Sequence, residues 1–208
     1  MGSGVVMRRN SHSVVKKRFL RLYLLSVVLF AGALLAGGPV EAKEAKKEQE
    51  QAEVRKMAKE TLGRLYSIQP SAEKAVQNAI GYAVFSNFGM KIFVAGGGTG
   101  NGVAVNNATK EETFMKMAEV QAGLGFGVKK FRLVWVFETE EALNSFINSG
   151  WKFGGQATAA AQLGDTGGAF AGAMSVAPDV WLYQLTDDGL ALELTAKGTK
   201  YYKDKELN

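Results

Sequence analysis

The chain has 208 residues and a formal net charge of +5, a length that fits one domain of ordinary size with an extension. It contains no cysteine, and its single histidine is His12. Disulfide bonds and thiol chemistry are therefore excluded. Because the chain after His12 has no histidine, Ser-His-Asp triads and the usual zinc sites are excluded there as well. An enzyme with this sequence would have to use carboxylate, Lys, Tyr or Ser-Lys chemistry.

The first 42 residues predict a signal peptide. Basic residues come first, namely Arg8, Arg9, Lys16, Lys17, Arg18 and Arg21. The uncharged run LYLLSVVLFAGALLA follows at 22–36, and Val40-Glu41-Ala42 supplies a small-x-small cleavage pattern. This run is shorter than the ~20 apolar residues of a membrane-spanning helix, so a cleaved signal is favoured over the alternative, an uncleaved anchor. We expect an exported protein, periplasmic or associated with the outer envelope, and not a lipoprotein because it lacks cysteine.

The positive charge is concentrated in this predicted signal. Six of the 25 basic residues and one of the 20 acidic residues lie before Lys43, which leaves 19 of each in the rest of the chain. The isoelectric point near 9.3 therefore reflects the signal and gives no support for nucleic-acid binding.

The mature chain is expected to begin with a charged polar linker at 43–52 and an amphipathic helix at 53–68. Apolar or small residues recur at three- and four-residue steps in this helix: Val54, Met57, Ala58, Thr61, Leu62, Leu65 and Ile68. Its other faces carry the basic residues Arg55, Lys56, Lys59 and Arg64. The stripe predicts a helix that docks on the domain's own sheet, and the alternative is a helix that binds a membrane surface or a partner.

After Pro70, Ser71 is expected to cap a short helix at 72–79. The apolar period then changes to two, and the segments GYAVFSNFG, KIFVAGGG and NGVAVNN predict three short strands. Residues 108–117 fit either a short helix or the start of a strand.

Glycines alternate at 96, 98, 100 and 102 and again at 123, 125 and 127. No Lys-Ser or Lys-Thr pair follows the first set, and the spacing of a dinucleotide fingerprint would place its third glycine on Asn101 or Val103. A phosphate-binding loop is therefore disfavoured. The alternation predicts two strands with bare faces in a tightly curved sheet, covered by another element or, alternatively, by a lipid.

The remaining segments predict strands and one helix. FRLVWVFET reads as a strand buried on both faces, and Thr139 is expected to cap the helix EEALNSFINS. Residues 154–175 predict a hairpin, DVWLYQLT and LALELTAKG a second one, and TKYYKDKELN a charged tail. The expected fold is α+β: a single domain on a curved, glycine-rich antiparallel sheet, with an N-terminal amphipathic helix and one or two further helices.

The order of GYAVFSNFG, GGGTGNGVAV, AGLGFG, LVWVFETEEALNSFINSGWKFGGQATAAA and VWLYQLTDDGLALELTAKGTKYYKDKELN resembles the SYLF domain family over residues 55–208. The resemblance implies a lipid-binding module without enzymatic activity. Eukaryotic members of this family bind phosphoinositide membranes, and some bind actin, through a basic amphipathic N-terminal region as well as the domain. Its bacterial members look like exported envelope proteins.

Basic clusters are the candidate sites for anionic head groups, because a lysine near an anionic membrane contributes about 1 kcal/mol. The candidates are Lys129, Lys130 and Arg132 at the start of one strand, Trp151 and Lys152 after a helix, Lys197 and Lys200 near the C-terminus, and the helix residues Arg55, Lys56, Lys59 and Arg64. The alternatives are a solvated turn, a solvated tail and core packing of Trp151.

The sequence predicts a non-enzymatic domain of the bacterial cell envelope that binds anionic phospholipid or a membrane surface, with no metal and no cofactor. The alternative is a structural or protein-interaction module of the envelope without direct lipid binding. A third hypothesis, a carboxylate-based hydrolase, has only Asp165, Asp179 and the pair Asp187-Asp188 to draw on, and aspartate at turns has an ordinary backbone role.

Overall fold

The computed structural model describes Met1 and residues 39–92, 95–122, 127–149, 152–153, 162–163, 169–191 and 199–208. Most of the predicted signal peptide, at 2–38, lies outside the described residues. Within the described part of the chain, no helix has the length and apolar character needed to cross a membrane. Residues Lys47–Asn208 form one compact unit, which is the domain described below.

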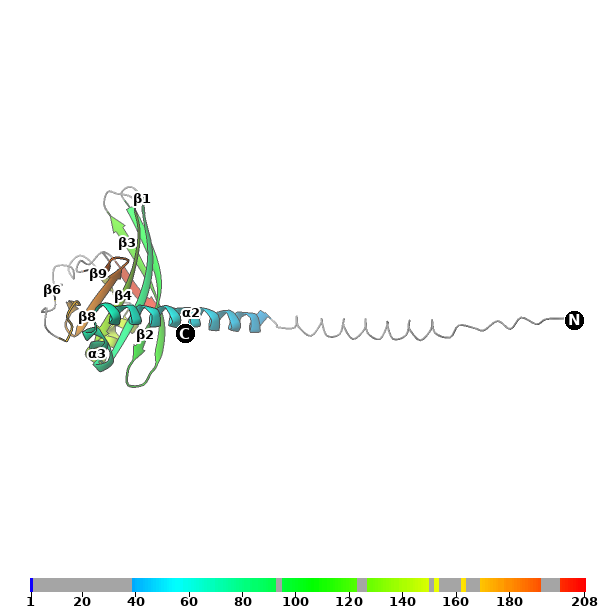
Figure 1. The fold of residues 1–208 in the computed structure, drawn as a ribbon, viewed down its shortest axis with the longest axis horizontal. Helices are drawn as coiled ribbons and strands as arrows, with labels where there is room; N and C mark the ends of the chain where they lie inside the picture. The colour runs from blue at the N-terminus through cyan, green and yellow to red at the C-terminus, as the bar shows by residue number, and fades with distance from the viewer. Residues whose placement is uncertain are drawn as a thin grey trace. The chain divides into compact units, whose positions relative to one another are not determined.

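The domain is a curled antiparallel sheet with helices on both faces (Figure 1). The described helices are α2 (Pro39–Ile68), α3 (Ser71–Asn78) and α4 (Glu140–Asn148). The described strands are β1 (Gly81–Ile92), β2 (Ala95–Asn106), β3 (Glu112–Ala122), β4 (Gly127–Phe137), β5 (Lys152–Phe153), β6 (Gln162–Leu163), β7 (Met174–Ala177), β8 (Val180–Thr186), β9 (Gly189–Ala191) and β10 (Thr199–Lys203). They run in the order β5-β10-β3-β2-β1-β4-β8-β7-β6, with β9 paired to β8. The predicted fold class is confirmed.

Alternation along the strands divides the core into two layers, because successive side chains of a strand point to opposite faces. On one face, Phe85, Leu133 and Trp135 pack with Leu143 and Phe146 of α4. The opposite face packs against α2 and α3; its buried residues include Val84, Val103 and Val134 from the sheet and Val54, Ala58 and Leu65 from α2. The expectation that the amphipathic helix docks on the domain's own sheet is confirmed.

The glycine-rich segment is strand β2, and two of its glycines make room for side chains of the neighbouring strands. A Cβ atom at Gly100 would lie 2.7 Å from Cγ of Met117, and one at Gly102 would lie 2.6 Å from Cε1 of Phe85. Both positions are therefore closed to a lipid chain. The second set of glycines is described only at Gly127, the first residue of β4; Gly123 and Gly125 lie outside the described residues.

Several local predictions were wrong. The three short strands expected between 81 and 106 are two strands of 12 residues each, because glycine does not interrupt β2 when both its neighbours pair with it. Of the two alternatives left open for residues 108–117, the strand is the one observed, since β3 begins at Glu112. Ser71 is the first residue of α3 and does not cap it; its hydroxyl accepts a hydrogen bond from Gln69. By contrast, Thr139 caps α4 as predicted, accepting from the backbone N–H of Ala142 at 3.4 Å.

The largest correction concerns the C-terminus, which was expected to be a charged tail. Residues Thr199–Lys203 are β10, which pairs with β3, and Tyr201 is completely buried. Leu207 is also buried. The lysines of 199–208, which suggested a solvated tail, occupy exposed positions of a folded segment. Their charge made the apolar alternation of this segment difficult to recognise in the sequence.

Candidate functional site

The sheet register places the predicted basic residues of three strands in two neighbouring rows. The first, called the arginine row, crosses the sheet as Arg132, Ser86, Asn101, Lys116 and Tyr202. The second, called the lysine row, crosses it as Lys130, Phe88, Thr99, Ala118, Lys200 and Lys152. Corresponding members of the two rows are two residues apart along each shared strand, so the rows occupy the same face, the one that carries α2. Basic positions far apart in the sequence are thereby neighbours.

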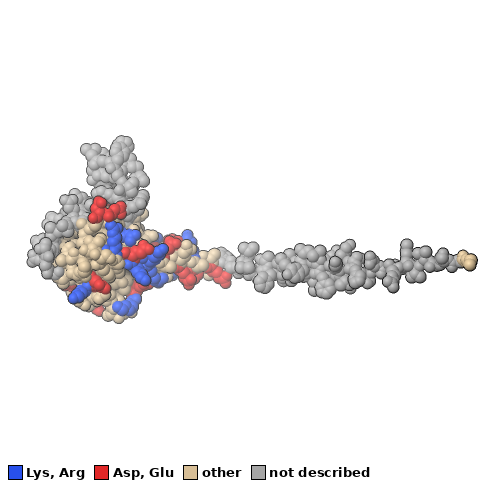
Figure 2. Space-filling model, viewed as in Figure 1, with Lys and Arg blue, Asp and Glu red and all other residues tan. Residues whose placement is uncertain are grey.

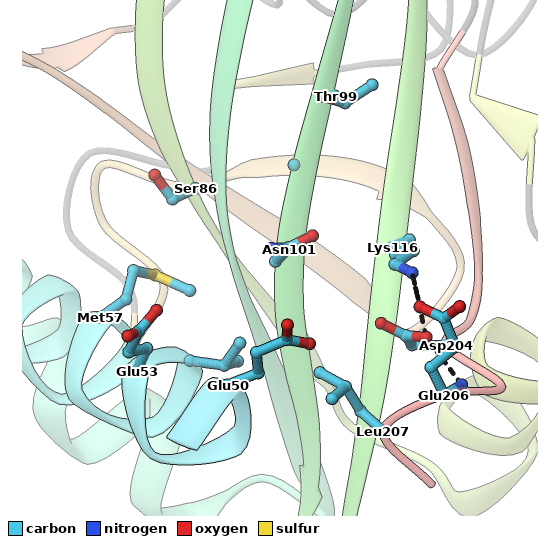
Figure 3. Close-up of a pocket in the computed structure, with 12 residues that line it drawn as sticks. Glu50, Glu53, Met57, Ser86, Thr99, Asn101, Lys116, Asp204, Glu206 and Leu207 are labelled. Carbon is cyan, nitrogen blue, oxygen red and sulfur yellow. Dashed lines mark hydrogen bonds and ion pairs between the residues drawn. The ribbon is translucent and has the colours of Figure 1, made fainter. Parts of the chain in front are cut away.

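Residues 47–68 of α2 cross the strands on this face, and the strands continue beyond the helix (Figure 1). The lysine row lies on the side of the arginine row away from α2. Thr99 and Lys200 of the lysine row are exposed, and Thr99 lies farther from the helix than Asn101 does (Figure 3). The sheet is therefore open at these two positions of the lysine row.

A pocket of about 590 Å³ lies in the corner between α2 and the two rows (Figure 3). It is lined by Glu50, Glu53, Val54 and Met57 of α2, by Ser86, Thr99, Gly100, Asn101 and Lys116 of the sheet, and by Asp204, Glu206 and Leu207. The lining thus contains four carboxylates and a single lysine. The pocket is acidic, whereas the lysine row beyond it has lysine at three backbone positions, Lys130, Lys152 and Lys200.

Lys116 is held in place by the C-terminal carboxylates. Its Nζ lies 3.1 Å from Oδ1 of Asp204 and 3.3 Å from Oε2 of Glu206. Asp204 is buried, and the hydrogen bond from Lys116 to it raises the pKa of the lysine. Lys116 therefore stays charged, and it joins β3 to the segment that follows β10.

The predicted basic face of α2 is partly used for internal contacts. Arg55 pairs with Glu112 at 2.7 Å and stacks over the ring of Phe114, and Arg64 donates hydrogen bonds to the carbonyls of Thr186 and Asp187. Lys56 and Lys59 are exposed. Figure 2 shows acidic and basic side chains intermixed over α2 and the adjoining sheet. Two of the four predicted helix residues thus anchor the helix to the sheet.

The remaining candidates are placed as follows. Arg132 is tied to α2, because it donates to the hydroxyl of Thr61 at 3.2 Å and lies 3.9 Å from a carboxylate oxygen of Glu60. Lys129 and Lys130 occupy successive positions of β4, hence opposite faces of the sheet, so the predicted Lys129-Lys130-Arg132 cluster is divided. Trp151 and Lys197 lie outside the described residues.

Lys152 and Lys200 are the candidates that the structure brings into direct register. They form a backbone pair between β5 and β10, although 47 positions of the chain separate them. Nζ of Lys200 lies 5.8 Å from the centre of the Tyr202 ring, which is 37% exposed. The sequence reasoning missed Lys116, Tyr202 and Asp204; the alternation of TFMKM was the one signal that could have placed Lys116 on a strand.

The aspartates considered as candidates for a hydrolase are at turns where the structure describes them. Asp179 takes a positive φ of 60° in the turn between β7 and β8, and its side chain accepts a hydrogen bond from Thr139. Asp187 lies in the turn before β9, and Asp165 lies outside the described residues. Among the residues described, no three His, Cys, Asp or Glu side chains are grouped so as to hold a metal ion.

Buried and half-buried tyrosines give the domain an expected sensitivity to alkali. Burial raises the pKa of Tyr66 and Tyr183 to about 12, and it also raises the pKa of Tyr82 and Tyr201. The unfolded chain releases these protons near the ordinary value of 10.0, before the folded chain does, so the free energy of unfolding must fall above that pH. The raised pKa of Lys116 acts in the same direction, because the stabilisation from the charged lysine is lost as the pH rises through that pKa.

The corresponding measurement is urea unfolding at about pH 8 and about pH 11, where we expect lower stability at the higher pH. Tyr183→Phe should reduce this loss. It should cost little at neutral pH, because the Tyr183 hydroxyl is buried without a hydrogen-bond partner in the described part of the chain. Equal stability at the two pH values would contradict the account.

The fold and the two rows define a class of protein: a small α+β domain on a curled sheet, with an acidic pocket beside a row of lysine positions. Residues 118–208 match the family model described as "Las17-binding protein actin regulator", the Ysc84 family. Beta cell expansion factor A of Aeromonas veronii is 32% identical over 171 residues, which cover 81% of this chain and 61% of that protein. The chain spans about three fifths of the length of this curated relative.

The chain belongs to the SYLF, or Ysc84, family. Membership of this family supports a lipid-binding or membrane-associated module at the level of the family. The resemblance inferred from the order of the sequence motifs is confirmed.

Proposed function

We propose that the protein is an exported, non-enzymatic lipid-binding domain of the bacterial envelope that contacts anionic head groups through its lysine row. The observation that carries the proposal is the register that brings Lys130, Lys200 and Lys152 to one level of the sheet. These residues come from β4, β10 and β5, three strands of a single sheet. A membrane surface that meets this level meets all three positions together.

The size of the effect follows from the charge of the row. Lysines near an anionic membrane contribute about 1 kcal/mol each, so three together strengthen binding by about two orders of magnitude. This attraction acts within a Debye length of about 8–10 Å at moderate salt, so it should weaken as salt increases. The row therefore supports reversible binding rather than permanent anchoring.

The acidic corner supports one orientation on the membrane. Glu53 is exposed and Glu206 has a side chain that is 81% exposed, and both line the pocket beside the arginine row. Anionic phosphates would be repelled there and attracted on the far side, at the lysine row. We expect the domain to meet the membrane with the part of the sheet that extends beyond α2.

Co-sedimentation with vesicles tests this function. Residues 43–208 contain the whole compact unit and omit the apolar run at 22–36, which would confuse the result. We expect binding to vesicles containing anionic phospholipid, little binding to neutral vesicles, and weaker binding at physiological salt than at low salt. Absence of binding to every vesicle would contradict lipid binding and turn attention to a protein partner of the envelope.

A further inference from the structure

A second pocket, of about 400 Å³, lies along one side of α3, and we call it the α3 pocket. Its volume is within the range of small-molecule binding sites. The helix lines it at three- and four-residue steps, with Ser71, Lys74, Ala75 and Asn78. Glu138, which directly follows β4, and Phe170 line it from outside the helix. Residues from three separate segments thus face one cavity.

Glu138 and Phe170 belong to a fixed acidic and aromatic corner of the α3 pocket. Oε2 of Glu138 accepts a hydrogen bond from Nε1 of Trp181 at 2.8 Å. The ring of Trp181 is stacked on that of Phe170, with the ring centres 4.5 Å apart and the planes 5° from parallel. The backbone N–H of Glu138 also donates to the carbonyl of Asp179 at 3.0 Å. Both the backbone and the side chain of Glu138 are therefore held in place beside an aromatic ring.

This corner has the chemistry of a site for an ammonium group. A carboxylate supplies the opposite charge, and the face of an aromatic ring attracts a cation within about 6 Å of its centre. In the part of the chain that the structure describes, no lysine or arginine forms an ion pair with Glu138. The negative charge of the corner is therefore available to a ligand.

The helix wall of the same pocket offers donors to an anion. Lys74 is exposed, and it forms no ion pair with any residue that the structure describes. Ser71 lies one turn before it on the same face of α3. The Ser71 hydroxyl accepts from the amide of Gln69 at 2.7 Å, which leaves its own proton free to donate. An ammonium group and a hydroxyl in this arrangement suit a phosphate or a carboxylate.

The two charges of the α3 pocket select for a ligand that carries both signs. A simple cation would be attracted by Glu138 and repelled by Lys74, and a simple anion would meet the reverse. Between them, Ala75 is 5% exposed and adds only a methyl group to the lining, so the cavity stays open. A molecule with an ammonium group and an anionic group a few atoms apart meets both charges at once.

We propose that the α3 pocket binds a small zwitterion. Glu138 and the ring of Phe170 hold its ammonium group, and Lys74 and Ser71 hold its phosphate or carboxylate. This chemistry occurs in the head group of phosphatidylethanolamine and in soluble molecules such as phosphoethanolamine. The site is separate from the lysine row, because a head group without an ammonium group, such as that of phosphatidylglycerol, offers nothing to Glu138.

Titration with phosphoethanolamine tests the proposal on residues 43–208, which contain the whole compact unit. Binding is followed by NMR through the indole N–H signal of Trp181, whose hydrogen-bond partner Glu138 lines the pocket. We expect a saturable shift, and at least about tenfold weaker binding of ethanolamine and of inorganic phosphate, since each meets only one of the two charges. No saturable shift with phosphoethanolamine, or equal affinity for ethanolamine, would overturn the proposal.

Two matched pairs of variants locate the ligand. Glu138→Gln removes the charge but keeps an oxygen that accepts from Trp181, and Glu140→Gln removes the same charge at an exposed position outside the pocket. Lys74→Gln is compared in the same way with Lys59→Gln on α2. We expect each pocket variant to lose about fivefold in affinity for phosphoethanolamine, and each control less than about twofold. Equal losses within both pairs would show that the ligand does not bind in the α3 pocket.

Vesicles distinguish the two sources of the zwitterion. Phosphatidylethanolamine is added to vesicles of phosphatidylglycerol. A several-fold gain in binding that Glu138→Gln abolishes would assign the pocket to a lipid head group. Saturable binding of phosphoethanolamine without this gain would assign it to a soluble zwitterion. Because the titration contains no lipid, its result is independent of whether the lysine row binds membranes.

Discussion

Phe146→Ala is expected to lower the free energy of unfolding by about 3–5 kcal/mol, the usual cost of deleting a buried aromatic ring. Phe146 is 1% exposed on α4. Its ring centre lies 5.0–5.3 Å from those of Trp135, Phe137 and Tyr201 and 6.1 Å from that of Phe85. Because these partners come from three strands and the sheet is fixed around them, it cannot collapse into the space left by the ring.

Urea unfolding of this variant can be compared with that of Ile147→Ala, which changes the next residue of the same helix. Ile147 is only partly buried against the same core, so its truncation should cost less than half as much. Equal losses would indicate that helix packing in general, rather than the ring cluster, holds α4 on the sheet.

Gly102→Ala should lower the free energy of unfolding by about 1–3 kcal/mol, although it adds only a methyl group. That methyl would meet the ring of Phe85 and the backbone carbonyl of Val84, and neither can move without disturbing β1. Gly63→Ala is the matched control, because a Cβ atom at that exposed position of α2 meets nothing within 4 Å.

In the control, alanine should raise stability by about 0.5–1 kcal/mol, since glycine is unfavourable within a helix. Opposite signs for the two substitutions in thermal or urea unfolding are the expected result. A neutral Gly102→Ala would mean that β2 does not approach β1 as closely as described.

Elements with strong local signals could be predicted from the sequence. Strand β4 alternates clearly, and α4 begins at a capping threonine and ends close to a glycine. The ends of strand β2 could not be predicted from the sequence. Its glycines make room for the side chains of Phe85 and Met117, which come from other strands. Strand β10 was missed because the alternation of the buried Thr199 and Tyr201 with the exposed Lys200 and Tyr202 is confined to five residues.

The candidate site depended on information that residue patterns do not contain. The sequence pointed to Lys130, Lys152 and Lys200 separately, but their common level follows from the order β5-β10-β3-β2-β1-β4, in which β10 inserts beside β3. Such non-local pairing and its register are set by packing of the whole sheet. The same pairing places Asp204 next to Lys116.

The most direct test of the account compares two triple substitutions that remove the same charge. Lys130, Lys152 and Lys200 are changed to Gln in one variant of residues 43–208, and Lys56, Lys59 and Lys74, which are exposed on α2 and α3, in the other. Binding of each to anionic vesicles is then measured at low salt. We predict about a hundredfold loss for the first and a much smaller loss for the second. An equal or larger loss for the helix variant would show that the lysine row is not the surface that meets the membrane.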